Sequence, residues 1–321
     1  MSRILYVSHD VDQPRGGIGV LYDHVAALRA NGFDAFIVHA TKDFRYPFAQ
    51  RDVPVLHAGS SFKILKTDVL VVPEDYAPVI KACRDLGCRK VLFCQNHFLV
   101  FQGIAPGESW REFGFTDYLC VSTPIREVMK RWFDVSASIV RPCIDRVYFS
   151  ERVKPIDSPI RLACMPRKGG VHNLRLVQGL LASDGFSHRA ELIWCEIDGL
   201  PKEQVAARLQ DAHIYVSTSV REGLGLPPLE AMAAGCLVVG FMGGGGVDYA
   251  SSENGVWVDD EDPWALAEAI EQTVAGLRDP NASPSLHAKR AAGQATALNY
   301  NRQQFERDLI AFWTALLQSG G

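Results

Sequence analysis

The 321-residue sequence has no apolar run near the ~20 residues that a membrane-spanning helix needs, so no transmembrane segment is expected. It also has no low-complexity segment and no internal repeat of solenoid or propeller period. The formal net charge is −4, whereas nucleic-acid binding needs a concentrated basic face, so no nucleic-acid partner is expected. MSRILYVSHD passes from a short apolar stretch directly to polar residues, which predicts a chain without a signal peptide and a cytoplasmic location.

The cysteines are scattered and form no C-x-x-C pair, and no histidine-rich tract lies near them. Most lie inside apolar runs. This pattern predicts buried, reduced thiols. The eight positions are Cys83, Cys88, Cys94, Cys120, Cys143, Cys164, Cys195 and Cys236.

The first half of the chain alternates apolar runs of strand length with helical segments. Residues 20–32 have helical apolar spacing after the glycine loop PRGGIG, and Gly32 is a C-terminal stop. Continuous apolar runs are typical of parallel strands that helices cover on both faces, so this half is predicted to be doubly wound α/β. The expected strands are 3–8, 34–40, 68–74, 90–95 and 117–122.

The same alternation restarts after residues 141–159, which hold three prolines and have neither helical nor strand period. We therefore expect one domain at 1–150, a second at 151–300, and a C-terminal helix at 301–321 that packs back on the first domain. The second domain is expected to have strands at 160–165, 190–196, 213–219 and 236–242, and helices near 172–183, 201–212, 263–276 and 284–298.

The segment REGLGLPPLEAMAAG places Glu222 and Glu230 eight positions apart. It follows the apolar run 213–219, so it is expected at the carboxyl edge of a parallel sheet, where such sheets bind ligands. Gly223 and Gly225 allow a sharp turn and a close approach to a ligand. A helix then begins at the proline pair, and its free amides form a ready phosphate site. Glu222 is therefore expected in the loop and Glu230 in the first turn of the helix.

Two interpretations of Glu230 follow from the residues alone. Its carboxylate could accept two hydrogen bonds from a vicinal diol such as ribose, each charge-assisted bond being worth about 1.5–3 kcal/mol. It could instead complement the helix dipole, which is worth about 0.3–1 kcal/mol. The residues alone favour neither.

The stretch SVREGLGLPPLEAMAAGCLVV, residues 219–239, resembles the E-x7-E signature of retaining glycosyltransferases of the GT-B fold, specifically glycosyltransferase family 4. Further stretches resemble the same family in order along nearly the whole chain. They are GGIG (16–19), VRPCIDRVYF (140–149), MPRKGG (165–170) and the tail GGGGVDYASSENGVWVDDEDPWALAEAI (243–270).

The resemblance implies two doubly wound, Rossmann-like domains facing across a cleft, with the acceptor on the N-terminal side and the nucleotide sugar on the C-terminal domain. Glu230 would bind the ribose hydroxyls, and Glu222 would lie near the donor sugar or the ribose phosphate. The turn at Gly223 would contribute to the donor site, and the amides of Gly225 and Leu226 would face phosphate or sugar oxygens.

The remaining site residues implied by the resemblance are Arg167 and Lys168, which would neutralise the leaving diphosphate, and Gly16, Gly17 and His97. The glycine amides would face the sugar or the diphosphate, and the histidine would contact the transferred sugar. Alternatively, Arg167 and Lys168 form a solvated basic turn and the two glycines form an ordinary turn. The histidine could likewise have only a structural role.

The function that the resemblance implies is transfer of a hexosyl unit, with retention, from a nucleoside diphosphate sugar to a glycan, lipid or small-molecule acceptor. A phosphate oxygen of the departing donor would take the proton of the acceptor hydroxyl in a front-face attack. A sugar-nucleotide epimerase of the same fold, or a protein that binds nucleotide sugars or glycans without catalysis, is the alternative.

No metal and no cofactor is expected, because basic residues and helix amides can carry the charge of the donor. Two D-x-D triplets, Asp10-Val11-Asp12 and Asp260-Glu261-Asp262, could suggest metal-assisted binding of a diphosphate. Asp262 is instead predicted to cap a helix, and Asp10 and Asp12, after the first strand, could contact the acceptor. The segment REVMKRWF (126–133) favours an ordinary amphipathic helix over a peripheral contact with an anionic membrane that carries a lipid-linked acceptor.

Overall fold

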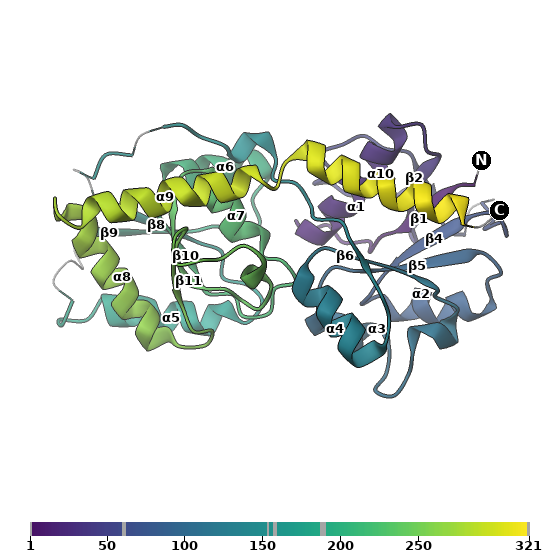
Figure 1. Ribbon diagram of the computed structural model, residues 1–321, viewed down its shortest axis with the longest axis horizontal. Coiled ribbons are helices and arrows are strands. Elements are labelled where there is room, and N and C mark those ends of the chain that lie inside the picture. The colour runs from purple at the N-terminus through teal and green to yellow at the C-terminus, as the bar shows by residue number, and fades with distance from the viewer. Residues whose placement is uncertain (1, 60–61, 153, 157–158, 187–190, 320–321) are drawn as a thin grey trace. The chain divides into compact units, whose positions relative to one another are not determined.

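The computed structural model describes residues 2–59, 62–152, 154–156, 159–186 and 191–319. The chain divides into two compact units (Figure 1): Met1–Pro142 together with Gln303–Gly321, and Cys143–Arg302. Each unit is built around a parallel sheet, and helices connect most of the successive strands. The doubly wound α/β prediction is therefore confirmed for both halves of the chain.

The first unit has a sheet in the order β3-β2-β1-β4-β5-β6-β7, and all neighbouring strands are parallel. Chain order reverses between β1 and β4, so their carboxyl ends form the crevice at which such sheets bind ligands. The strands are β1 (Ile4–Val7), β2 (Ala35–His39), β3 (Val55–His57), β4 (Val69–Pro73), β5 (Arg89–Cys94), β6 (Asp117–Cys120) and β7 (Ser138–Ile139). The helices are α1 (Gly16–Ala30), α2 (Ala77–Ala82), η1 (Cys83–Asp85), η2 (His97–Leu99), α3 (Val100–Gly103), η3 (Trp110–Phe113), α4 (Thr123–Phe133) and α10 (Arg302–Gln318).

Helix α1 begins earlier than its apolar spacing suggested, and this corrects the position of the glycine pair. Gly16 and Gly17 are its first two residues, after an extended Arg15, rather than part of a loop. The amides of a first turn have no partner within their helix, so glycine costs less there than in a helix interior. Ile18 is buried with the rest of the apolar face, which explains why the helix includes the glycines.

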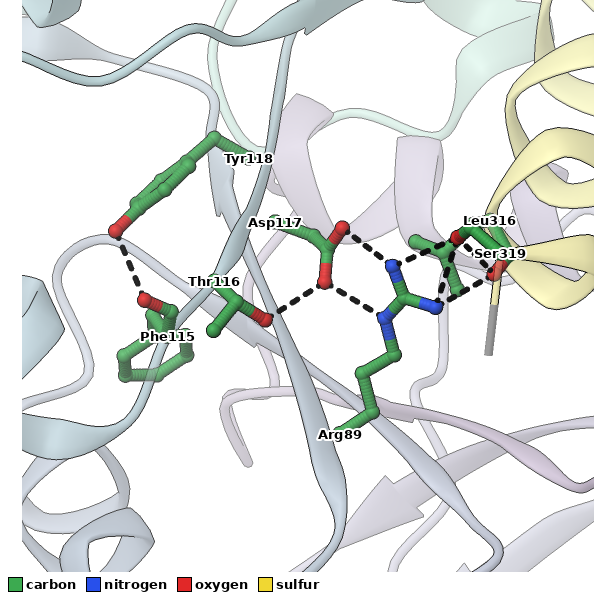
Figure 2. A network of polar contacts seen from close by, with 7 residues as sticks. All are labelled: Arg89, Phe115, Thr116, Asp117, Tyr118, Leu316 and Ser319. Atoms are coloured by element: carbon green, nitrogen blue, oxygen red, sulfur yellow. Dashed lines mark hydrogen bonds and ion pairs between the residues drawn. The ribbon is translucent and has the colours of Figure 1, made fainter. Parts of the chain in front are cut away.

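Helix α10 packs against the sheet of the first unit. Trp313 is completely buried, and its Nε1 donates to the hydroxyl of Tyr6 on β1 at 3.1 Å. Figure 2 shows how the end of the helix is held: Arg89 forms two 2.8 Å bonds with Asp117 and donates to the carbonyl of Leu316 at 2.6 Å. A guanidinium that bridges two strands and a helix end fixes the last turn of α10.

The second unit has a sheet in the order β12-β11-β10-β8-β9, again parallel throughout. The order reverses between β8 and β10. Its core contains apolar side chains of α5, α8 and the central strands, including Leu174, Val216 and Ile270. The strands are β8 (Ile160–Cys164), β9 (Leu192–Glu196), β10 (Ile214–Ser217), β11 (Leu237–Phe241) and β12 (Val256–Val258). The helices are η4 (Arg146–Tyr148), α5 (Gly170–Leu181), α6 (Lys202–Asp211), α7 (Leu226–Ala233), η6 (Gly245–Asp248), α8 (Pro263–Arg278) and α9 (Ser283–Leu298).

In the part of the chain that the structure describes, no helix is both long enough and apolar enough to cross a membrane. Six of the eight cysteines are buried, whereas Cys143 and Cys195 are partly exposed.

Replacing Trp313 with alanine should destabilise the first unit by about 3–5 kcal/mol, because the change opens a cavity under α10 and removes the donor to the Tyr6 hydroxyl. Chemical denaturation followed by circular dichroism measures the loss. Trp132→Ala is the matched control, since that indole is 69% exposed and should change stability by less than about 0.5 kcal/mol. Equal effects of the two substitutions would contradict the anchoring of α10.

Candidate active site

In the second unit, the loops that follow β8 and β10 are bonded to each other at the point where strand order reverses. The hydroxyl of Ser219 donates to the carbonyl of Arg167 at 3.1 Å, and the amide of Val220 donates to the carbonyl of Lys168 at 3.3 Å. A Cβ on Gly170 would lie 2.6 Å from the hydroxyl oxygen of Thr218. Only glycine therefore permits this close approach of the two loops.

The joined loops place Lys168 next to Glu222. Nζ of the lysine lies 2.6 Å from Oε2 of the glutamate, whose side chain is only 7% exposed, while that of the lysine is 42% exposed. Lys168 also has a positive φ of 48°, an uncommon conformation for a residue with a side chain. An ammonium has three N–H groups, so the lysine can still donate to a bound anion while it pairs with Glu222.

A third loop, after β11, completes the surroundings of Glu222. The amide of Glu222 donates to the carbonyl of Gly243 at 2.8 Å, and Glu222 also forms a parallel bridge with Gly244. The two oxygens of Asp260 accept the amides of Gly243 and Gly244 at 3.0 and 3.1 Å. These glycines have φ values of 64° and 78°. Asp260 therefore fixes the loop that contacts Glu222.

Sequence reasoning treated Asp260 only as part of a D-x-D triplet. The structure shows that its carboxylate caps backbone amides, and it confirms Asp262 as the N-cap of α8, accepting the amides of Trp264 and Ala265 at 3.1 and 3.0 Å. The available signal for Asp260 was an acidic residue two positions after the short apolar stretch Val256–Val258, with a glycine-rich loop earlier in the chain. Pairing the two required the tertiary structure.

Glu230 lies in the second turn of α7, not in the first turn as expected. The helix begins at Leu226, because Gly225 is its N-cap with φ of 87°, so the two prolines occupy the second and third positions. The hydroxyl of Tyr249 donates to the carbonyl of Gly225 at 2.8 Å and holds this cap. Proline has no N–H, so the first turn offers fewer donors to an anion than an ordinary helix start.

Glu230 has different surroundings from Glu222. Burial raises its pKa, and this shift is opposed by a hydrogen bond from the hydroxyl of Tyr148 and by the positive charges of Arg167 and Lys202. Tyr148 is buried and lies in the 141–159 segment, for which the sequence predicted a domain boundary and a resemblance to the family but no site residue. Lys202 also bonds Asp145 at 3.1 Å.

The adjacent Arg167 and Lys168 therefore act on different carboxylates. The charge of Arg167 acts on Glu230 and Tyr148, whereas Lys168 pairs with Glu222. Gly16 and Gly17, which were also expected to face the donor, begin α1 in the first unit. The other seven expected donor-side residues follow β8 or β10 in the second unit. They are Arg167, Lys168, Glu222, Gly223, Gly225, Leu226 and Glu230.

In the first unit, His97 belongs to the turn after β5. Buried Glu74 accepts the backbone amides of Gln95 and Asn96 at 3.0 and 2.6 Å, and Nε2 of Gln95 donates to the carbonyl of Gly17 at 3.2 Å. Burial lowers the pKa of His97, and its buried Nδ1 has no hydrogen-bond partner among the described residues. Glu74, for which the sequence predicted no role, thus fixes the backbone directly before His97.

Asp10, at the same edge of the sheet, forms hydrogen bonds that stabilise the fold. Its carboxylate lies 2.7 Å from Nδ1 of His39 and accepts the amide of Thr41 at 2.6 Å, so it holds the turn after β2. Asp12 is exposed. Over the described ranges, no group of three or more His, Cys, Asp or Glu side chains is arranged to hold a metal ion.

Comparisons with known proteins agree with this geometry. Residues 197–282, which contain the glutamate pair and the β11 loop, match the family model described as glycosyl transferases group 1. The chain is 25% identical over 309 residues to an alpha-1,6-glucosyltransferase of Actinobacillus pleuropneumoniae, covering 91% of this chain and 90% of that protein. The chain is a glycosyltransferase.

Solved structures establish the fold of this glycosyltransferase as GT-B. Sucrose-phosphate synthase from Thermosynechococcus elongatus superposes with a TM-score of 0.71 at 15% identity, covering 99% of this chain and all of that one. Anabaena HepE in complex with UDP and glucose superposes with a TM-score of 0.71 at 12% identity, and the match covers 98% of this chain and 100% of the HepE chain. The GT-B expectation is thereby confirmed.

The glycosyltransferase should lose stability as pH rises because of Glu74. Burial and the charge of Asp75 raise the pKa of Glu74 from 4.5 to about 8. The folded protein then holds a proton that the unfolded chain releases, so the unfolding free energy falls between about pH 4.5 and pH 8, by up to about 1.4 kcal/mol per pH unit. Thermal denaturation of Glu74→Gln and the wild type should show melting temperatures that diverge in favour of the variant as pH rises. A constant difference would contradict this origin.

Replacing Asp260 with asparagine should loosen the β11 loop, because the amide group brings two N–H donors towards Gly243 and Gly244. Amide hydrogen exchange in residues 242–246 should accelerate about tenfold, which corresponds to roughly one lost hydrogen bond. Asp259→Asn is the control, since that side chain is exposed and lies one residue away. Unchanged exchange in Asp260→Asn would refute the clamp.

Proposed function

We propose that this glycosyltransferase moves a hexosyl unit, with retention, from a nucleoside diphosphate sugar to a glycan, lipid or small-molecule acceptor, without a metal ion or cofactor, in the cytoplasm. The observation that carries the proposal is the Lys168–Glu222 ion pair at the strand reversal of the second unit, with Glu230 eight residues after Glu222 in the second turn of α7. A cation paired with a buried carboxylate suits a donor that carries both a diphosphate and a sugar.

Glu230 is proposed to accept hydrogen bonds from the two ribose hydroxyls. The hydrogen bond from Tyr148 and the charge of Arg167 favour the ionised form, while burial disfavours it. Ribose hydroxyls would add further donors to the carboxylate and so favour the ionised form more strongly. Nucleotide binding and deprotonation of Glu230 would then be linked.

Lys168 and Arg167 are proposed to stabilise the diphosphate as it leaves. The bond between the anomeric carbon and the phosphate oxygen breaks while the acceptor oxygen bonds to the same face of that carbon, and the hydroxyl proton passes to the departing phosphate. Negative charge therefore develops on the diphosphate, where fixed cations lower the barrier. Glu222 is proposed to orient Lys168. Its backbone is held by the loop after β11, at the place where the donor sugar is expected.

UDP-glucose is the first donor to test, because the A. pleuropneumoniae relative is a glucosyltransferase and HepE was solved with UDP and glucose. Release of UDP from UDP-glucose should require an acceptor and should yield an α-linked product, which proton NMR of the anomeric signal identifies. A β-linked product would contradict retention. Release of free glucose or of an epimerised sugar nucleotide, with no product on any acceptor, would contradict transfer.

Substitutions should separate the two carboxylate surroundings. Lys168→Met should lower kcat by about 100-fold or more by removing stabilisation of the leaving group, with Lys42→Met as an exposed control.

Glu230→Gln should weaken UDP binding, measured by calorimetry, by about 1–3 kcal/mol, with Glu268→Gln on the exposed face of α8 as the control. Unchanged UDP affinity in Glu230→Gln would refute the ribose assignment.

A further inference from the structure

The first unit has its own charged pair at its strand reversal, and the proposed function does not use it. His9 lies two residues after the end of β1, and Asp75 lies two residues after the end of β4. The two side chains therefore meet beyond the strands between which chain order reverses. Ligands of open parallel sheets bind beyond the carboxyl ends of such strands. The pair therefore lies where this sheet is expected to hold a ligand.

The geometry of the pair leaves one imidazole nitrogen for a ligand. Nε2 of His9 lies 2.9 Å from Oδ1 of Asp75, and the two side chains are 27% and 19% exposed. The imidazole also stacks on the ring of Tyr76, with centroids 4.1 Å apart and an interplanar angle of 23°. In the described part of the chain, Nδ1 of His9 has no hydrogen-bond partner.

The neighbouring acidic groups are committed to other roles. Glu74 points inward and binds the backbone amides after β5, and Asp10 binds His39 and the amide of Thr41. Asp75 is thus the carboxylate that orients His9. In the neutral imidazole whose Nε2–H donates to Asp75, Nδ1 is the nitrogen without a proton and can accept an O–H.

A partly exposed aromatic ring beside a hydroxyl acceptor and a carboxylate suits a neutral sugar. The ring can cover the C–H face of a pyranose, while Nδ1 and the second oxygen of Asp75 accept its hydroxyls. An anionic ligand is disfavoured, because Asp75 carries a negative charge at the same place. We propose that His9, Asp75 and Tyr76 bind the acceptor and that this acceptor is a neutral carbohydrate.

This inference rests on the proposed transfer for the identity of the ligand as an acceptor, but sugar binding at the site can be measured without turnover. The probes are the methyl α- and β-pyranosides of glucose, galactose and N-acetylglucosamine. Two-dimensional NMR of protein labelled with ¹⁵N at histidine, with the His9 signals assigned by their absence in His9→Gln, reports directly on Nδ1.

At least one pyranoside should shift the His9 signals, and Asp75→Asn should weaken that binding about tenfold, the equivalent of roughly one hydrogen bond. Asp34→Asn is the matched control, since that carboxylate pairs with Arg29 near the amino end of β2, at the opposite edge of the sheet. If none of the pyranosides shifts the His9 signals, or if Asp75→Asn binds them like the wild type, the inference is wrong.

Kinetics then distinguish this inference from the proposed function. With UDP-glucose and the pyranoside that binds, His9→Gln and Asp75→Asn should raise KM for the acceptor about tenfold and leave kcat and UDP affinity nearly unchanged. If the pyranosides bind at His9 but no donor is turned over, the proposed function fails and the sugar site stands. If transfer occurs and both variants have the acceptor KM of the wild type, the proposed acceptor site is wrong and the proposed transfer stands.

Discussion

The Lys168–Glu222 ion pair is the interaction on which the donor side of the second unit depends. It joins residues 54 positions apart, and it forms only because Gly169 and Gly170 let the β8 loop lie directly on the β10 loop. The lysine adopts a left-handed backbone conformation to reach Glu222. Such a conformation costs free energy and persists where surrounding bonds determine it, which is typical of sites that orient a charge.

The two units use their strand reversals in the same physical way. Crossovers leave in opposite directions from the two central strands, so no helix covers the carboxyl ends between them, and side chains from both loops can meet there. In the second unit the meeting pair is Lys168 with Glu222, and in the first it is His9 with Asp75. The chemistry differs: an ammonium suits a diphosphate, whereas an imidazole oriented by a carboxylate suits hydroxyl groups.

Much of the fold follows from local pattern, because continuous apolar runs identify buried parallel strands and Asp262 marks a helix start. Local pattern also located the loops that carry Arg167 and Glu222. It placed the start of α1 four residues too late and the start of α7 one residue too late, since glycine and proline at a helix start are equally typical of the preceding loop. Asp260 and Glu74 could not be found this way, because each holds a backbone turn that lies 16 to 22 residues away in the chain.

Tyr148 changes the interpretation of residues 141–159, most of which belong to the second unit. The three prolines of this segment indicate a boundary, yet the side chain of Tyr148 is buried and bonds Glu230. Asp145 in the same segment bonds Lys202. A phenol donor beside a buried carboxylate lowers the cost of keeping that carboxylate ionised. The segment is therefore part of the site's electrostatics as well as a connection. Loss of the Tyr148 hydroxyl would act on Glu230 alone, because Glu222 draws its compensation from Lys168.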